Sequence, residues 1–148
     1  MVEVISNSPQ ETCAVGERIS QHLYAGSIVA LKGTLGSGKT CLTKGIALGL
    51  GITENITSPT YTIINEYLLP SSDRLNAVKL FHIDAFRLND DSDFEQTGGL
   101  EIINCNEICV IEWSERIEKS IPSNAITVLI HITGSSSRLI KISGLEKI

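Results

Sequence analysis

Residues 33–40 read Gly-Thr-Leu-Gly-Ser-Gly-Lys-Thr, and this stretch decides the fold class. It matches the phosphate-binding loop pattern G-x-x-x-x-G-K-[ST] at every fixed position. A glycine-rich turn can direct several backbone N–H groups at one anion, and the positive end of the next helix adds to that field. In such a loop Lys39 reaches the outer phosphates of a nucleotide and the Thr40 hydroxyl binds Mg²⁺. The expected nucleotide-binding residues here are Gly33, Thr34, Leu35, Gly36, Ser37, Gly38, Lys39, Thr40 and Cys41.

The segments on both sides of the loop support this interpretation. Residues 28–31, Ile-Val-Ala-Leu, form a short apolar run typical of a buried strand. After the loop, Leu42, Ile46 and Leu50 recur every four residues, which predicts a helix. A phosphate-binding loop joins such a strand to such a helix. The alternative, a glycine-rich turn with an unrelated lysine, is therefore disfavoured.

Composition sets the outer bounds. The length of 148 residues predicts one domain, residues 1–148, and 42% apolar with 20% charged residues is ordinary for a globular protein. No apolar run is long enough to span a membrane, and the N-terminus lacks a signal-like stretch, so a cytoplasmic location is expected. The net charge is −5 and the basic residues are scattered, which argues against a broad nucleic-acid-binding face. The cysteines lack metal-ligand spacing and are expected to be reduced and mostly buried thiols.

The order of predicted elements indicates an α/β protein. A helix is expected from a capping Ser8 to about Tyr24, and another over residues 94–104, where Gly98-Gly99 weakens the pattern. The expected strands are residues 2–5, 28–31, 61–67, 78–84, 108–111, 125–132 and 139–142. The last two are separated by Gly134-Ser135-Ser136-Ser137 and read as a late antiparallel hairpin. The fold expected is a P-loop NTPase-like three-layer sandwich with a mostly parallel central sheet.

Two carboxylates close two of the predicted strands. Asp84 ends one apolar run and Glu112 ends another, and ligands bind open α/β sheets at these strand ends. Either acid alone could equally cap its strand or pair with Arg87 or Arg116. In a chain that also has a phosphate-binding loop, the two together favour Mg²⁺ binding by Thr40, Glu112 and Asp84.

Two other side chains accompany these acids. His82 shares a strand face with Asp84 and could support that acid, although a packed histidine is preferred. Trp113 follows Glu112 directly, and it could belong to the core, cover the nucleotide or face a partner protein.

Four motifs together resemble the TsaE family of small bacterial P-loop ATPases, formerly called YjeE. They are the loop at 33–40, Ser-Pro-Thr-Tyr at 58–61, His-Ile-Asp-Ala-Phe-Arg-Leu at 82–88, and Ile-Glu-Trp at 111–113. Their order and spacing match, and the resemblance runs from about Thr12 to Arg138. Departures such as Cys41 and Phe86 leave the residues assigned to chemistry intact.

The resemblance implies a role in making threonylcarbamoyladenosine (t6A), a modified base of tRNA. It implies Mg²⁺-dependent ATP hydrolysis, with TsaD and TsaB as protein partners and with tRNA contacted only indirectly, through the complex. Residue by residue it implies that Lys39 holds phosphates, that Asp84 and Glu112 serve the metal or its water, and that Thr60 senses the terminal phosphate. Trp113 matches a tryptophan that is important for activity in the family. The resemblance also implies that the stretch from Ile5 to Pro9 and the hairpin at Ser137 and Arg138 lie near the adenine.

Two other functions remain open at this stage. A small P-loop kinase of a metabolite or nucleoside shares the loop but usually carries an arginine-rich lid, and the five arginines here are well spread. A nucleotide-sensing subunit without useful turnover is the other. For an ATPase, no arginine clearly serves as a finger, so hydrolysis is expected to be slow without partners.

Overall fold

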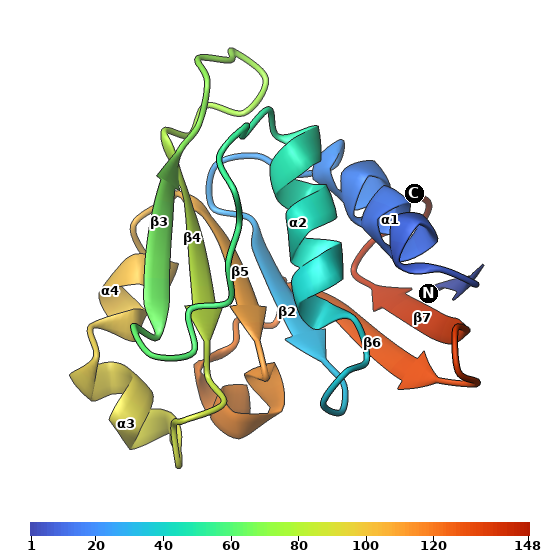
Figure 1. The fold of residues 1–148 in the computed structure, drawn as a ribbon. Coiled ribbons are helices and arrows are strands. Elements are labelled where there is room, and N and C mark those ends of the chain that lie inside the picture. Colours follow the sequence, from blue (N-terminus) through green and yellow to red (C-terminus); the bar gives the residue numbers. More distant parts are fainter.

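The fold is built on one seven-stranded sheet, seen in a computed structural model of residues 1–148 (Figure 1). The strand order is β1-β7-β6-β2-β5-β4-β3. The strands are β1 (Val2–Ser6), β2 (Ile28–Lys32), β3 (Ile64–Leu68), β4 (Lys79–Asp84), β5 (Ile108–Glu112), β6 (Ile126–Ile132) and β7 (Arg138–Ser143). The helices are α1 (Pro9–Ser20), α2 (Lys39–Gly49), α3 (Asp91–Gln96) and α4 (Gly99–Ile103), and a 3₁₀ segment, η1, spans Ser114–Ser120.

The centre of the sheet is parallel and its edges are antiparallel. Strands β6, β2, β5 and β4 run parallel to one another, while β3 at one edge and β7 with β1 at the other run antiparallel to their neighbours. Strands β6 and β7 form the expected late hairpin. The burial of all five residues of β5 is typical of an interior strand of a parallel sheet.

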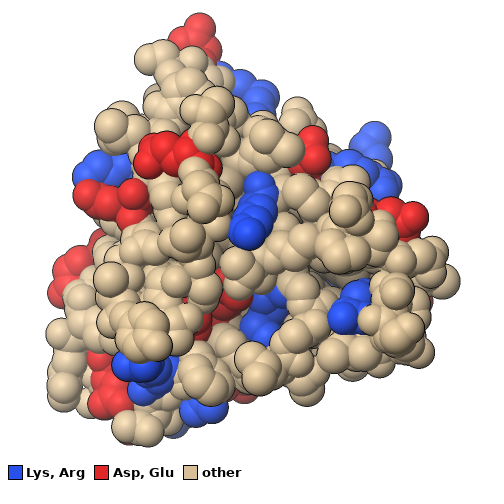
Figure 2. All heavy atoms as spheres, viewed as in Figure 1, with Lys and Arg blue, Asp and Glu red and all other residues tan.

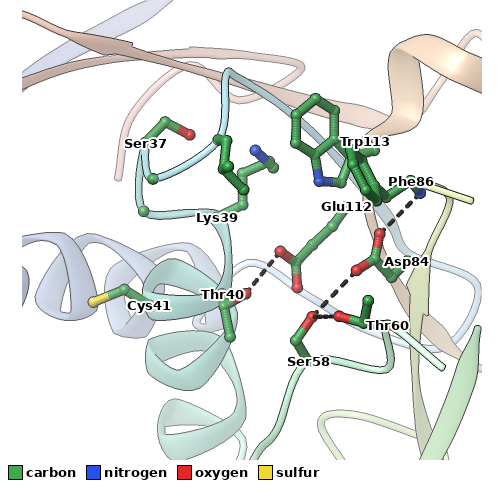
Figure 3. Close-up of a pocket in the computed structure, with 13 residues that line it drawn as sticks. Ser37, Lys39, Thr40, Cys41, Ser58, Thr60, Asp84, Phe86, Glu112 and Trp113 are labelled. Carbon is green, nitrogen blue, oxygen red and sulfur yellow. Dashed lines mark hydrogen bonds between the residues drawn. The ribbon is translucent and has the colours of Figure 1, made fainter. Parts of the chain in front are cut away.

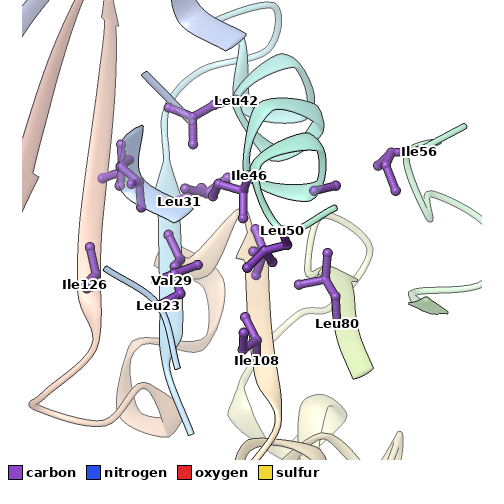
Figure 4. Close-up of a cluster of buried hydrophobic side chains, with 14 of the residues drawn as sticks. Leu23, Val29, Leu31, Leu42, Ile46, Leu50, Ile56, Leu80, Ile108 and Ile126 are labelled. Atoms are coloured by element: carbon purple, nitrogen blue, oxygen red, sulfur yellow. The ribbon is translucent and has the colours of Figure 1, made fainter. Parts of the chain in front are cut away.

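Helices cover both faces of the sheet, which gives the three layers expected (Figure 1). Apolar residues of α1 and α2 pack on one face with Val29, Leu31, Leu80 and Val110, and part of this larger core is drawn in Figure 4. On the other face, Phe94 of α3 and Ile117 of η1 pack with strand residues that include Ile83, Cys109 and Ile111. None of the helices has the length and apolar character needed to cross a membrane.

Three predicted boundaries were wrong. The first helix ends at Ser20, not Tyr24, because the next N–H groups bond three residues back, as in His22 to the Ile19 carbonyl and Leu23 to the Ser20 carbonyl. The chain then leaves the helix axis, and the N–H of Ala25 bonds to the carbonyl of Leu75. Residues 61–63 are not part of β3, because the N–H of Ile63 closes a turn onto the carbonyl of Pro59.

The third wrong prediction was a single helix over residues 94–104. The structure has two short helices there, and Gly98 between them is in the left-handed region with φ 84°. This conformation favours glycine and breaks the helical hydrogen bonding. Gly99 is needed as well, because a Cβ there would lie 2.2 Å from a ring carbon of Phe94.

Strand register brings the candidate site together. Leu31 near the end of β2 is level with Glu112 at the end of β5, and Glu112 is level with Asp84 at the end of β4. The loop of residues 33–38 leaves this same edge of the sheet and leads into α2. The acids and the phosphate-binding loop therefore lie at one edge, as expected for parallel strands.

Candidate functional site

A hollow of about 330 Å³ lies where the loop, α2 and the ends of β4 and β5 meet. Figure 3 shows the side chains that surround it. The face seen in Figure 2 is hollowed near the N-terminal end of α2, and acidic and basic side chains both reach the surface there. The lining residues are Leu35, Gly36, Ser37, Gly38, Lys39, Thr40, Cys41, Ser58, Thr60, Asp84, Phe86, Glu112 and Trp113.

The loop backbone is suited to binding an anion. Gly38 precedes α2 in the left-handed region with φ 112°, and no side chain caps the helix there. The N–H groups of the first helical turn have no partner within the helix, and they carry its positive partial charge. Gly33 has no room for a side chain, because a Cβ would lie 2.6 Å from the Ser37 hydroxyl and 2.8 Å from the Ile130 carbonyl.

Lys39 begins α2 and folds back on the loop. Its Nζ donates to the carbonyl oxygens of Gly33 at 2.6 Å and Thr34 at 3.0 Å, and it lies 3.9 Å from the centroid of the Trp113 ring. Burial lowers the pKa of the Lys39 ammonium, while the carboxylates of Glu112, Glu115 and Asp84 oppose that shift. Only 5% of the residue is exposed. The lysine is thus a poorly hydrated cation, which gains from a phosphate partner.

Thr40 and the two acids form an oxygen-rich floor. The Thr40 hydroxyl donates to Glu112 Oε1 at 2.9 Å. Asp84 accepts from the backbone N–H of Phe86 at 2.9 Å and from the Ser58 hydroxyl at 3.2 Å. Both acids are buried, with 3% of Glu112 and 5% of Asp84 exposed. The three residues expected at the metal are therefore brought together.

Neither acid pairs with an arginine. The Arg87 guanidinium lies over the Tyr61 ring at 4.6 Å, and that of Arg116 lies over the Phe86 ring at 5.3 Å. No ion pair in the structure joins Asp84 or Glu112 to either of them. This removes the alternative in which the acids serve only as arginine partners.

Thr60 and Trp113 lie at the rim of the hollow. The Thr60 hydroxyl is 3.0 Å from that of Ser58, which in turn bonds Asp84 (Figure 3). Trp113 is in the left-handed region with φ 57°, which is rare for a bulky residue, and its ring lies 4.9 Å from that of Phe86. The indole lies over Lys39 and also packs against the smaller core that includes Ile83 and Ile111. Of the three positions considered for Trp113, contact with the core is therefore seen, while covering the nucleotide or facing a partner protein stays a prediction.

Of the two segments expected near the adenine, Ser8, Pro9 and Arg138 line a second hollow beside the loop, whereas Ser137 does not. The volume of this hollow is about 250 Å³. Pro9 lines it and accepts a hydrogen bond from the Cys41 thiol at 3.0 Å. Arg138 donates to the carbonyls of Ser37 at 3.0 Å and Gly36 at 3.1 Å, which ties the late hairpin to the loop. Ile5 does not line either hollow and is 69% exposed.

Sequence reasoning missed two features. His82 is fully buried, as expected of a packed histidine, but its Nε2 also contacts Glu112 Oε2. Strand alternation pointed to Asp84 as the neighbour, whereas the partner lies on the adjacent strand, which only the register reveals. The expectation of mostly buried thiols was wrong, because only Cys109 is buried, while Cys13 and Cys41 are half-buried and Cys105 is exposed.

Comparisons with known proteins identify the family of this chain. Residues 6–140 match the family described as "Threonylcarbamoyl adenosine biosynthesis protein TsaE". The chain is 39% identical to the tRNA threonylcarbamoyladenosine biosynthesis protein TsaE of Treponema pallidum, over 94% of this chain and 98% of that protein. It is 36% identical to the protein of the same name from Bacillus subtilis, over 88% of this chain and 78% of that one.

A solved structure extends the likeness to three dimensions. The crystal structure of Bacillus subtilis YdiB superposes with a TM-score of 0.72 at 29% identity, covering 95% of this chain and 83% of that one. The family match, over residues 6–140, includes the loop, both acids, β6 and the start of β7. The chain therefore belongs to the TsaE family of P-loop nucleotide-binding proteins, which act in the biosynthesis of threonylcarbamoyladenosine in tRNA.

Proposed function

We propose that this protein binds ATP with Mg²⁺ and hydrolyses it as a subunit that acts with TsaD and TsaB in t6A biosynthesis. The observation that carries the proposal is the convergence of Thr40, Glu112 and Asp84 beside the loop. In this proposal one domain, residues 1–148, holds the whole nucleotide site, and contact with tRNA is left to the partners.

The donor set fits Mg²⁺. A hydroxyl and two carboxylates offer only oxygen ligands, the kind that this ion prefers. No three His, Cys, Asp or Glu side chains are grouped so as to hold a metal by themselves. That pattern suits an ion that takes its remaining ligands from nucleotide phosphates and water. When bound, Mg²⁺ would neutralise charge on the phosphate oxygens.

Residues of the chain itself would bind the phosphates, orient the attacking water and border the adenine. The N–H groups of the loop and the first turn of α2 bind phosphate oxygens. Lys39 turns from the carbonyls of Gly33 and Thr34 and donates to the outer phosphates. One of the two acids, Asp84 or Glu112, orients the attacking water and accepts its proton. Ser58 links Asp84 to Thr60, so the position of Thr60 can follow the terminal phosphate. Pro9 and Arg138 bound the hollow proposed for the adenine.

Hydrolysis by the isolated chain is expected to be slow. No arginine lines the hollow beside the acids, and Arg87 and Arg116 stack on aromatic rings. A partner that adds a cationic donor at the terminal phosphate would raise turnover by roughly 10³-fold or more, as arginine fingers do.

The test measures ATP turnover by the chain alone and with the TsaB–TsaD pair. Lys39→Ala is expected to lower turnover by roughly 10²-fold or more, because it removes a charged donor from the transition state. Lys44→Ala, on an exposed position of the same helix, serves as the control and should retain activity. Equal rates with and without partners would exclude activation by them, and full activity of Lys39→Ala would exclude this loop as the site.

The same assay separates the alternatives. Hydrolysis releases one phosphate for each ADP formed. ADP without free phosphate would mean transfer to an acceptor, as in a small kinase. Nucleotide binding without any ADP, in the presence of partners, would indicate a nucleotide sensor.

A further inference from the structure

The carboxylate of Glu112 is held from two sides. Glu112 Oε1 accepts the hydroxyl hydrogen of Thr40 at 2.9 Å, and Glu112 Oε2 contacts Nε2 of His82. Thr40 lies at the start of α2, above the end of the strand, and His82 lies in the neighbouring strand β4. Both oxygens of this side chain are therefore fixed by groups from different elements.

His82 reaches Glu112 from inside the protein. Its Cα is level with that of Val110, two residues before Glu112 on β5, so the two side chains are diagonal neighbours on one face of the sheet. The ring is fully buried and is not among the residues that line either hollow beside the loop. It therefore has no path to a nucleotide or to a bound ion except through Glu112.

The direction of the hydrogen bond follows from the partner. An ionised carboxylate only accepts, so Nε2 of His82 carries the hydrogen and donates it to Glu112. The other ring nitrogen, Nδ1, is buried and has no partner. Glu112 is thus the single hydrogen-bond partner of a ring whose burial leaves its other polar atom unpaired, which is unfavourable. If His82 contributed to packing alone, an apolar side chain of similar size would be more stable at this position.

We propose that His82 is a positioning residue that fixes the Glu112 carboxylate for Mg²⁺–nucleotide binding. The inference rests on the proposed function, because it assigns a supporting partner to one of the proposed metal ligands. A glutamate side chain loses rotamer freedom when it is ordered, which is unfavourable for ligand binding. The bond from His82 orders the carboxylate before the ligand arrives, and it leaves the oxygen beside Thr40 facing the hollow.

Two amide substitutions provide a matched pair. In His82→Gln the amide nitrogen reaches the position of the native Nε2 and can donate to Glu112. In His82→Asn the shorter side chain places its amide near the native Nδ1, out of reach of Glu112. Both variants bury one neutral amide in the same cavity, so they differ in reach to the carboxylate and by one methylene group.

The first measurement is the affinity for ATP in excess Mg²⁺ and in EDTA. In the wild type Mg²⁺ should tighten binding. His82→Asn should lose roughly 10-fold or more of that tightening, the usual effect of removing a partner of a metal ligand, with affinity in EDTA unchanged. His82→Gln should retain most of it. Equal tightening in both variants, or equal loss in EDTA and Mg²⁺, would overturn the proposal.

A second measurement needs neither metal nor nucleotide. The imidazole N–H of His82 should give a slowly exchanging proton resonance in the nucleotide-free protein, because it is buried and bonded to a carboxylate. The resonance is assigned by its loss in His82→Gln, and it should shift or vanish in Glu112→Ala. A resonance that Glu112→Ala leaves unchanged would refute the bond, even if His82→Asn does not fold.

The outcomes also separate this inference from the proposed function. If wild-type protein binds ATP equally well with and without Mg²⁺, both the proposed metal site and this inference are contradicted. Mg²⁺-tightened binding that survives in His82→Asn would remove the inference and leave the proposed function standing. Mg²⁺-tightened binding lost in His82→Asn, without any ATP turnover, would support His82 and contradict hydrolysis.

Discussion

At the level of single residues, the contact between Lys39 and Trp113 has the clearest consequence for function. The ammonium lies 3.9 Å from the centre of the indole and donates to two loop carbonyls. The indole is held there by a left-handed backbone at Trp113, a conformation that costs roughly 1–3 kcal/mol. Because a phosphate must draw Lys39 from these partners, nucleotide binding should change the surroundings of Trp113.

Trp113 should therefore report nucleotide binding by fluorescence. It is the only tryptophan in the chain, so the emission has a single source. Titration with ATP and Mg²⁺ is expected to change the emission saturably as the ammonium leaves the ring. The control is Lys39→Ala, which should start from a different emission and respond far less. Unchanged emission in wild-type protein whose saturation is established by calorimetry would show that Lys39 stays on the indole.

The residues of the candidate site differed in how far the sequence predicted their positions. Lys39, Thr40, Asp84 and Glu112 follow from a motif and from the rule that ligands meet the ends of parallel strands. The contact of His82 with Glu112 depends on how β4 and β5 align, and no local pattern encodes that register.

At the level of elements, the close contact of α1 with α2 determines how the loop is held. The two helices lie side by side (Figure 1). Gly16 of α1 and Gly45 of α2 lie where the helices touch, and neither has space for a side chain. A Cβ at Gly45 would lie 1.9 Å from the carbonyl oxygen of Cys13, and one at Gly16 would lie 2.2 Å from that of Leu42. Helix α2 begins at Lys39, so its position against α1 also sets the position of Lys39 and Thr40.

Gly45→Ala should destabilise the protein, although alanine is the better helix former by roughly 1 kcal/mol. The clash is with backbone, which cannot rotate away, so the helices must separate. A net loss of about 1–3 kcal/mol is expected, the usual range for overpacking, measured as the free energy of unfolding in urea. Lys44→Ala, at the adjacent exposed position, controls for the change to alanine. Equal stability of the two variants would show that the helices can move apart without cost.

The elements themselves were largely predictable, and the errors have a common cause. Strands β2 and β5 follow from short apolar runs, and the start of α1 from the capping Ser8. The errors at Tyr24, at residues 61–63 and at Gly98 all fall where the chain turns to bond with a distant segment or changes direction. Local patterns describe the middle of an element, whereas its end is set by the turn that follows, here a left-handed Gly98, a local bond from Ile63 to Pro59, and distant bonds from Ala25 and Gly26.

At the level of the whole molecule, both cores share one sheet, so opening of its centre should require global unfolding. Cys109 reports on that centre. It lies in β5 between β2 and β4, and it is 1% exposed. Burial raises the pKa of its thiol, so the reactive thiolate is scarce in the folded state. By contrast, Cys105 is exposed in the turn before β5 and open to reagent.

Thiol labelling followed by peptide mapping should therefore show two extremes. Cys105 should react at once, and Cys109 only at the rate set by unfolding. A ligand that binds the folded state lowers the unfolded fraction by a factor of 1 + [L]/Kd, so ATP with Mg²⁺ at ten times its Kd should slow labelling of Cys109 by roughly 11-fold.

Cys41 cannot serve this purpose, because it lines both hollows and nucleotide would shield it directly. Cys109 lines neither hollow, so slower labelling of Cys109 reports only the stabilisation of the folded state by the ligand. If ATP shields Cys41 while Cys109 keeps its rate, β5 opens locally without loss of the site, and the sheet is not one cooperative unit.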